Sequence, residues 1–120
     1  MKLQCLRPIL WVDDVRATIN YYVGVLGFNL GDYLEEINWG FVYRDNVEFM
    51  FSRPPASVSY NGPMLSGSLY LNTDDVDAWW EALKDKAMIV YPIDDFPYNM
   101  REFAIKDCNG YIIQFGKAIA

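Results

Sequence analysis

One stretch occurs twice in the chain and decides its fold. LRPILWVDDVRATINYY at residues 6–22 and SLYLNTDDVDAWWEAL at residues 68–83 both place an alternating apolar run before Asp-Asp-Val and a helical pattern after it. Alternation with a period of two predicts a strand, whereas apolar residues three and four positions apart predict a helix. The aspartates in front of each helical pattern can cap the N-terminus of that helix. The sequence therefore predicts an internal repeat of a strand followed by a helix.

Each repeat is followed by a predicted β-hairpin. WGFVYRDNVEFMFS at residues 39–52 turns at Asp45-Asn46, and REFAIKDCNGYIIQFG at residues 101–116 turns near Asn109-Gly110. Both turns carry the residues that tight hairpin turns favour. Each half of the chain is thus expected to hold a strand, a helix and two or three further strands.

The halves define two modules of a single domain. We expect module one at residues 1–53, a proline-rich linker at residues 54–66 and module two at residues 67–120. A length of 120 residues with 52% apolar content suits one compact domain over residues 1–120. The predicted fold class is α+β.

Composition also restricts the class of partner. The net charge of −6 argues against nucleic-acid binding, because a phosphate backbone requires a basic face. No run of twenty apolar residues occurs, so we expect no signal peptide and no membrane span. We expect a cytoplasmic protein whose acidic surface is compatible with a cationic ligand.

Strand alternation assigns the side chains of each module to two faces. Val47, Phe49 and Phe51 form an unbroken apolar face, which is expected to lie under a helix because each helix must bury its own apolar stripe. By the same alternation Gln114, near the end of the last predicted strand, points to the opposite, concave face. A turn at Asn109-Gly110 would place Phe103 beside it.

Pairing across the two predicted hairpins completes this concave face, because residues opposite each other in an antiparallel ladder share a face. Aromatic rings among a few polar groups are typical of a binding cleft. The residues predicted to line it and to contact a ligand are Arg7, Trp39, Phe41, Tyr43, Glu48, Met50, Ser68, Tyr70, Asn72, Arg101, Phe103 and Gln114.

The order of the motifs resembles that of a known family. The run WVDDVRATINYYVGVLGF and the closing pattern RxFxxxDxxGxxxxF in REFAIKDCNGYIIQF are similar to those of the vicinal-oxygen-chelate superfamily, which includes glyoxalase I, extradiol dioxygenases and bleomycin resistance proteins. The resemblance spans nearly the whole chain. It implies two βαβββ modules whose mixed sheets curl around a shared cleft, commonly completed by a second subunit, so that a homodimer is expected. Cys108 departs from the family, where proline often follows the aspartate.

The resemblance also implies where a metal would be held. Metal-using relatives place ligands at positions that correspond here to Arg7, Met50, Ser68 and Gln114. Divalent catalytic metals prefer carboxylate or imidazole donors, and the chain has no histidine. We therefore expect no metal and no cofactor, with Gln114 as a neutral hydrogen-bonding group at a former ligand position.

Two functional hypotheses from different classes follow, besides a fold whose cleft is filled by its own side chains. The first is a metal-free protein of the bleomycin-resistance type that sequesters an aromatic or cationic small molecule. The second is a lyase or isomerase of the same fold, in which Glu48 acts as general base and Arg7 or Arg101 steadies an enolate. Two alternatives stay open: Glu48 either pairs with Arg7 or contacts a ligand, and Arg101 either holds an anionic group or pins its loop.

Overall fold

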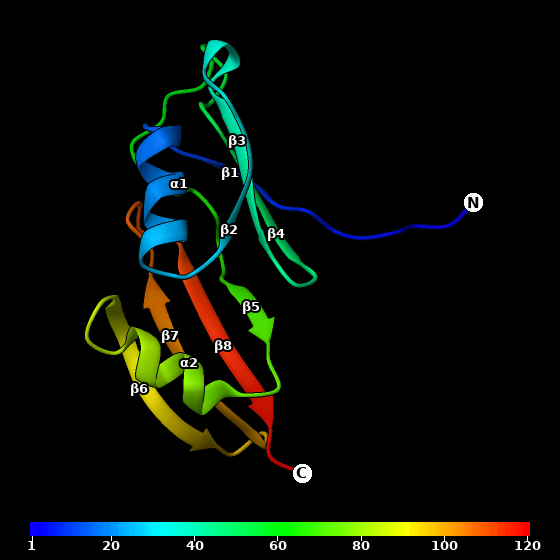
Figure 1. The fold of residues 1–120 in the computed structure, drawn as a ribbon, viewed down its shortest axis with the longest axis vertical. Coiled ribbons are helices and arrows are strands. Elements are labelled where there is room, and N and C mark those ends of the chain that lie inside the picture. Colours follow the sequence, from blue (N-terminus) through cyan, green and yellow to red (C-terminus); the bar gives the residue numbers. More distant parts are fainter. The chain divides into compact units, whose positions relative to one another are not determined.

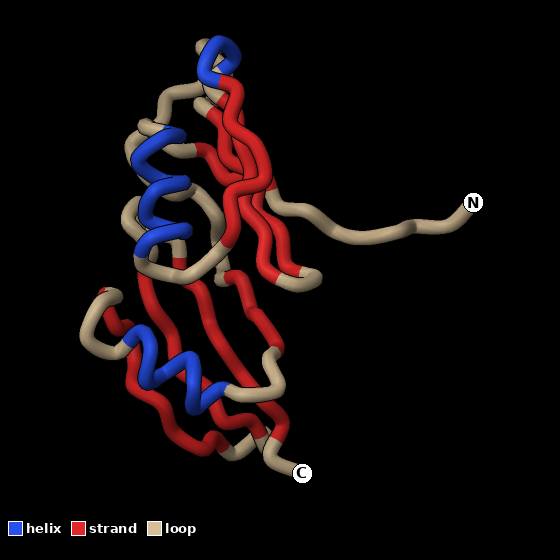
Figure 2. Tube along the Cα trace, viewed as in Figure 1, coloured by secondary structure: helices blue, strands red, loops and turns tan.

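The computed structural model describes residues 1–120 and divides into two compact units, Met1–Gly62 and Pro63–Ala120. We call them unit 1 and unit 2. Each unit contains one four-stranded mixed sheet with an α-helix along one of its faces (Figures 1 and 2). The fold class is α+β, as predicted, and each unit has the βαβββ order.

Unit 1 forms a sheet with strand order β1-β4-β3-β2. Its elements are β1 (Ile9–Trp11), α1 (Val15–Gly24), β2 (Asn29–Leu34), the short 3-10 helix η1 (Glu35–Ile37), β3 (Trp39–Arg44) and β4 (Val47–Ser52). The strands β1 and β4 are parallel, whereas β3 is antiparallel to both of its neighbours.

Unit 2 repeats this arrangement with strand order β5-β8-β7-β6. Its elements are β5 (Leu69–Asn72), α2 (Val76–Leu83), β6 (Met88–Phe96), β7 (Met100–Lys106) and β8 (Ile112–Ala118). The edge strand β6 is irregular. Its pairing with β7 shifts register on both sides of Tyr91, and Pro92 lies within it.

The internal repeat is confirmed at the level of single hydrogen bonds. Asp14 caps α1 by accepting a hydrogen bond from Ala17 N at 2.9 Å, and Asp75 caps α2 by accepting one from Ala78 N at 3.0 Å. After each first strand the backbone makes the same bond, from Val12 N to Ser52 O and from Thr73 N to Gly116 O. Equivalent sequence signals therefore produce equivalent local structures in both units.

The core of each unit lies between its helix and its sheet. In unit 1, Tyr22 of α1 packs its ring against Phe49 and Phe51 of β4, with ring centroids 5.5 and 4.8 Å away. In unit 2, Trp79 of α2 stacks on Phe115 of β8 at 4.9 Å. The opposite face of each sheet carries no helix of its own unit, and we call it the open face.

The register of the first hairpin is confirmed. Tyr43 lies opposite Glu48, Phe41 opposite Met50, and Trp39 opposite Ser52. The turn contains only two residues, and Asp45 adopts a positive φ of 52°, which aspartate tolerates in such turns.

The predicted register of the second hairpin is wrong by one residue. Lys106 pairs with Ile112, so that the loop contains the five residues 107–111 in place of a two-residue turn. The carboxylate of Asp107 accepts hydrogen bonds from the backbone N–H groups of Asn109 and Tyr111, at 2.8 and 2.9 Å, and this holds the wider loop. A slip of one residue moves every side chain of a strand to the other face relative to its partner.

Two predicted site residues are affected by this slip. Phe103 lies in the core on the helix side, fully buried and stacked on Phe115 at 5.1 Å. Arg101 also lies away from the open face, where it binds Asp77 of α2 and Asp95 of β6, each at 3.0 Å. The prediction that both face the concave side is wrong, and Arg101 instead ties the helix to the sheet.

Neither α-helix combines the length and the apolar character that crossing a bilayer requires.

Candidate functional site

The open face of unit 1 presents a row of aromatic side chains along β3. Trp39, Phe41 and Tyr43 alternate with core residues, so all three project from the same face. The rings of Trp39 and Phe41 are in contact, with centroids 5.7 Å apart. Met50 of β4 and Ile9 of β1 continue the row of Phe41 across the sheet. The result is a largely apolar surface with partly exposed rings.

A glycine gives the ring of Phe41 its place. A Cβ atom added at Gly31 of β2 would lie 2.1 Å from Cε2 of Phe41, so the ring lies directly over this residue. Gly31 is also where the pairing of β2 with β3 shifts register. Any side chain at this position would displace the phenyl ring.

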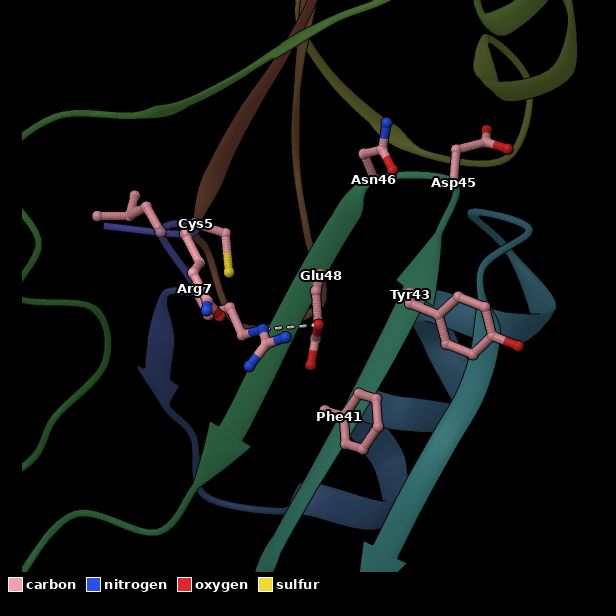
Figure 3. A pocket seen from close by; sticks show the side chains of 9 residues that line it. Cys5, Arg7, Phe41, Tyr43, Asp45, Asn46 and Glu48 are labelled. Atoms are coloured by element: carbon pink, nitrogen blue, oxygen red, sulfur yellow. Dashed lines mark ion pairs between the residues drawn. The ribbon is translucent and has the colours of Figure 1, made fainter. Parts of the chain in front are cut away.

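An ion pair stands beside the aromatic row. Arg7 Nε lies 2.9 Å from Glu48 Oε2 (Figure 3), and the side chain of Glu48 is about one quarter exposed. The two residues, together with Phe41 and Tyr43, border a hollow of about 410 Å³. Figure 3 shows the rings of Phe41 and Tyr43 on the strand next to the one that carries Glu48. The Arg7–Glu48 ion pair, one of the two alternatives that the sequence left open for Glu48, is therefore formed.

The remaining residues lining this hollow come from the N-terminal segment and the β3–β4 turn; they are Gln4, Cys5, Leu6, Asp45 and Asn46.

The open face of unit 2 is built around a buried carboxylate. Glu102 of β7 is 1% exposed and accepts hydrogen bonds from Tyr70 Oη at 3.1 Å, from Gln114 Nε2 at 3.1 Å and from Tyr91 Oη. The nearby Tyr98 also helps to lower the pKa of Glu102. We call Tyr70, Tyr91, Tyr98, Glu102 and Gln114 the Glu102 cluster. Three neutral donors, Tyr70, Tyr91 and Gln114, thus hold one acid.

Gln114 organises the cluster from β8. Its Nε2 donates to Tyr91 Oη at 2.7 Å as well as to Glu102, and its Oε1 accepts a hydrogen bond from Ser68 Oγ. Both ends of the amide are therefore engaged. Asn72 lies two residues beyond Tyr70 on the same side of β5 and is exposed.

The ring of Tyr70 lies across a glycine, as the ring of Phe41 does in unit 1. A Cβ atom added at Gly116 would lie 1.9 Å from the hydroxyl oxygen of Tyr70 and 2.5 Å from its Cζ. Only glycine therefore lets Tyr70 reach across β8 to Glu102.

The hydrogen bonds fix the protonation states of the cluster. Burial by itself raises the pKa of Glu102, but the side chains of Tyr91, Tyr98, Tyr70 and Gln114 outweigh it and hold that pKa below its ordinary value of 4.5. Burial, together with the bond to Glu102, raises the pKa of Tyr91 to about 12 and moves the pKa of Tyr70 in the same direction. At neutral pH the cluster is one carboxylate held by protonated phenols.

The four positions where metal-using relatives place ligands do not fit a divalent ion. Arg7 is a cation that already pairs with Glu48, and Met50 offers only a thioether. Ser68 and Gln114 bond to each other, and the amide of Gln114 is committed to the Glu102 cluster. No group of three or more His, Cys, Asp or Glu side chains is arranged to hold a metal. The donor set is that of a hydrogen-bonded surface.

The structure thus brings the predicted residues together in two groups. Arg7, Trp39, Phe41, Tyr43, Glu48 and Met50 gather on unit 1, whereas Ser68, Tyr70, Asn72 and Gln114 gather on unit 2. Glu102, Tyr91 and Tyr98 were missed. The sequence signal for the correct register was Asp107 in DCNG. Its side chain can hold a longer loop by accepting hydrogen bonds from the backbone N–H groups two and four residues on, and this register brings Glu102 to the open face.

Comparison with known proteins agrees with this architecture. The chain belongs to the Glyoxalase/Bleomycin resistance protein/Dioxygenase superfamily, whose family model matches residues 4–115. No curated protein sequence matches the chain.

Three solved structures illustrate the likeness. TioX from Micromonospora sp. ML1 has a TM-score of 0.79 and 22% identity, covering 96% of this chain and 98% of TioX. The bleomycin-binding protein of bleomycin-producing Streptomyces verticillus, complexed with copper(II)-bleomycin, has a TM-score of 0.73 and 23% identity, covering 96% of both chains. Lactoylglutathione lyase from Agrobacterium tumefaciens has a TM-score of 0.71 and 17% identity, covering 95% of this chain and 92% of the lyase. At these identities the likeness shows the fold.

Proposed function

We propose that the chain is a metal-independent binding protein that sequesters a planar aromatic small molecule on the open face of unit 1. The observation that carries the proposal is the row of Trp39, Phe41 and Tyr43 beside the hollow of about 410 Å³. Small-molecule sites typically combine aromatic walls with a few placed polar groups, which Arg7 and Glu48 supply here.

The exposure of these rings supports binding by stacking. The Tyr43 side chain, near the turn end of β3, is 42% exposed, and Ile9 on the same face is 54% exposed. Exposed apolar groups that adjoin one another mark interaction sites more often than isolated ones do. An aromatic ligand on this face would remove both from water and gain offset or edge contacts with the rings.

Metal independence is proposed from the donor chemistry. Of the four former ligand positions, Arg7 is paired with Glu48, Ser68 and Gln114 are bonded to each other, and Met50 offers only a thioether. The relative from Streptomyces verticillus was crystallised with copper(II)-bleomycin. We extend a ligand of that kind to this chain as a candidate only.

Calorimetric titration with copper(II)-bleomycin and with acridine tests the proposal. We expect binding of at least one of the two, and we expect Phe41→Ala to weaken it about tenfold by removing a stacking surface. The matched control is Val23→Ala, which trims an exposed side chain on α1 and should leave affinity within about twofold. Acridine binding should survive treatment of the protein with a chelator.

Two results would contradict the proposal. One is acridine affinity that disappears with the chelator and returns with a divalent metal. The other is equal ligand affinity in wild type and Phe41→Ala.

The enzyme alternative rests on Glu48 as a base. Its Oε2 is held by Arg7 at 2.9 Å, which leaves one carboxylate oxygen for a substrate. This geometry favours the ion pair as a polar border of the binding surface. Turnover of a thioester or other substrate that Glu48→Gln abolishes, with ligand affinity unchanged, would support the enzyme instead.

We also propose that the chain acts as a cytoplasmic homodimer, on the basis of the family it belongs to. Light scattering coupled to size-exclusion chromatography measures the mass directly. A mass of twice 13.9 kDa is expected, and a mass of 13.9 kDa at ligand-binding concentrations would rule the dimer out.

A further inference from the structure

Glu102 is a buried charge without a cationic partner. The residue is 1% exposed, and none of the ion pairs in the structure involves it. The adjacent Arg101 points to the other side of the sheet, where Asp77 and Asp95 occupy its guanidinium. Buried carboxylates are usually paired with a positive group. The charge of Glu102 is instead held by neutral donors alone.

The direction of the hydrogen bonds gives the surface above Glu102 a definite character. Tyr70 donates its hydroxyl proton to the carboxylate, so the remaining lone pairs of its oxygen can accept, as can those of the exposed Tyr98 hydroxyl. Tyr70 is 38% exposed and Tyr98 is 59% exposed. The ring of Tyr98 stacks on Phe96 at 5.6 Å, and Phe96 packs edge-on against Tyr91. The open face of unit 2 therefore offers hydroxyl acceptors and electron-rich ring faces above a fixed negative charge.

We propose that the Glu102 cluster by itself binds a protonated amine, with Tyr70 and Tyr98 in contact with the ammonium group and Glu102 as the positioning residue. The inference goes beyond the proposed function, because it places a second binding site on unit 2 alone. An ammonium supplies N–H donors for the tyrosine oxygens and a positive charge for the ring faces, and it compensates the charge of Glu102.

Other ligand groups match this surface less well. An anion would meet the charge of Glu102 and acceptors without protons to give. A metal ion would have to displace the donors that already occupy both carboxylate oxygens, Oε1 bonded to Tyr70 and Oε2 bonded to Tyr91 and Gln114. An ammonium needs no such rearrangement, because it binds to the tyrosines and leaves the bonds to Glu102 intact.

Three probes that share one indole ring test the inference: tryptamine, tryptophol and indole-3-acetate, which carry a positive, a neutral and a negative side chain. Affinities are measured by chemical-shift titration of the isotope-labelled full chain at pH 7. Wild type is expected to bind tryptamine about tenfold more tightly than tryptophol, the size of one cation–ring contact, and indole-3-acetate most weakly. The largest shifts should fall on Tyr70 and Tyr98.

Variants separate positioning from general loss of structure. Glu102→Gln should bring tryptamine and tryptophol within about twofold of each other while tryptophol affinity is retained. Tyr98→Leu, at a position that is 59% exposed, should reduce the preference for tryptamine in the same way. Tyr33→Leu on β2 of unit 1 is the matched control and should leave the preference unchanged.

The outcomes distinguish this inference from the proposed function. Equal affinity of wild type for tryptamine and tryptophol, both weakened by Phe41→Ala, overturns the amine site and leaves aromatic binding intact. A tryptamine preference that persists in both Glu102→Gln and Tyr98→Leu assigns the amine to another place and also overturns the inference. If none of the three probes binds, the amine site is overturned, whereas titration with acridine and copper(II)-bleomycin decides the proposed function.

Discussion

Replacing Gly116 by alanine should disconnect Tyr70 from Glu102 without altering either residue. The new Cβ atom would lie 1.9 Å from the tyrosine oxygen and 2.5 Å from Cζ, far inside van der Waals contact. Tyr70 is the movable partner, because its ring reaches across the strand from β5 and the residue is 38% exposed. The ring is expected to swing outward, and the hydrogen bond of 3.1 Å to Glu102 is lost.

The magnitude follows from two opposing effects. A hydrogen bond to a charged group is worth about 1.5–3 kcal/mol, and the partial exposure of Tyr70 favours the lower end. Alanine restricts the unfolded chain more than glycine does and returns about 0.4–1 kcal/mol. Gly116→Ala is therefore expected to destabilise the protein by about 0.5–1 kcal/mol net. Tyr70→Phe, which loses the same bond and nothing else, should cost about 1.5 kcal/mol.

A double-mutant cycle measured by urea unfolding isolates the shared bond. Since each single variant already loses the Tyr70–Glu102 bond, the double variant should be more stable than the sum of the two effects by about 1.5 kcal/mol. Gly24→Ala is the control, because nothing lies within 4 Å of its added Cβ, and it should combine additively with Tyr70→Phe. Additivity of Gly116→Ala with Tyr70→Phe within about 0.5 kcal/mol would refute the reasoning.

Four further predictions concern the core, a helix cap, the buried charge and the phenol of Tyr91. Phe51→Ala should lower the free energy of unfolding by about 3–5 kcal/mol, measured by urea unfolding, because a fully buried ring against Tyr22 leaves a cavity. Asp75→Ala should cost about 1 kcal/mol in the same assay by removing the bond to Ala78 N, and Asp75→Asn should recover most of it. Because the folded pKa of Glu102 lies below 4.5, its contribution to stability is present above pH 4.5 and is lost as pH falls through the folded value. In thermal unfolding experiments, Glu102→Gln should therefore reduce the fall in melting temperature at acidic pH. On the alkaline side, the raised pKa of Tyr91 adds stability that is complete below pH 10 and is lost as pH rises toward about 12, so a melting temperature constant across that interval would contradict the assignment.

The sequence predicted those parts of the fold whose signals are local. The caps Asp14 and Asp75, the strand-then-helix repeat and the two-residue turn at Asp45-Asn46 each depend on residues close together in the chain. Once that turn is known, alternation alone fixes the open face of unit 1. The six predicted residues of unit 1 consequently lie together.

The wrong predictions for Phe103 and Arg101 in unit 2 arise because the loop before β8 has five residues where two were predicted. Asn109-Gly110 is a good two-residue turn on composition, and Gly110 does adopt a positive φ of 100°. The side chain of Asp107 nevertheless stabilises the longer loop, which turns Phe103 toward the helix and Glu102 toward the open face. The sequence could not predict the face of Tyr91 for a different reason. The register shifts in β6 interrupt the alternation from which that face would be assigned.

The irregular edge strand β6 has a consequence for self-association. An intact edge offers a row of free amide and carbonyl groups on which another chain can polymerise as in amyloid. Pro92 has no amide hydrogen to donate, and the neighbouring Asp94 and Asp95 would force carboxylates together in a stack of identical chains. The same features that break the ladder therefore act as gatekeepers, and they protect this border of the sheet from fibril growth at high protein concentration.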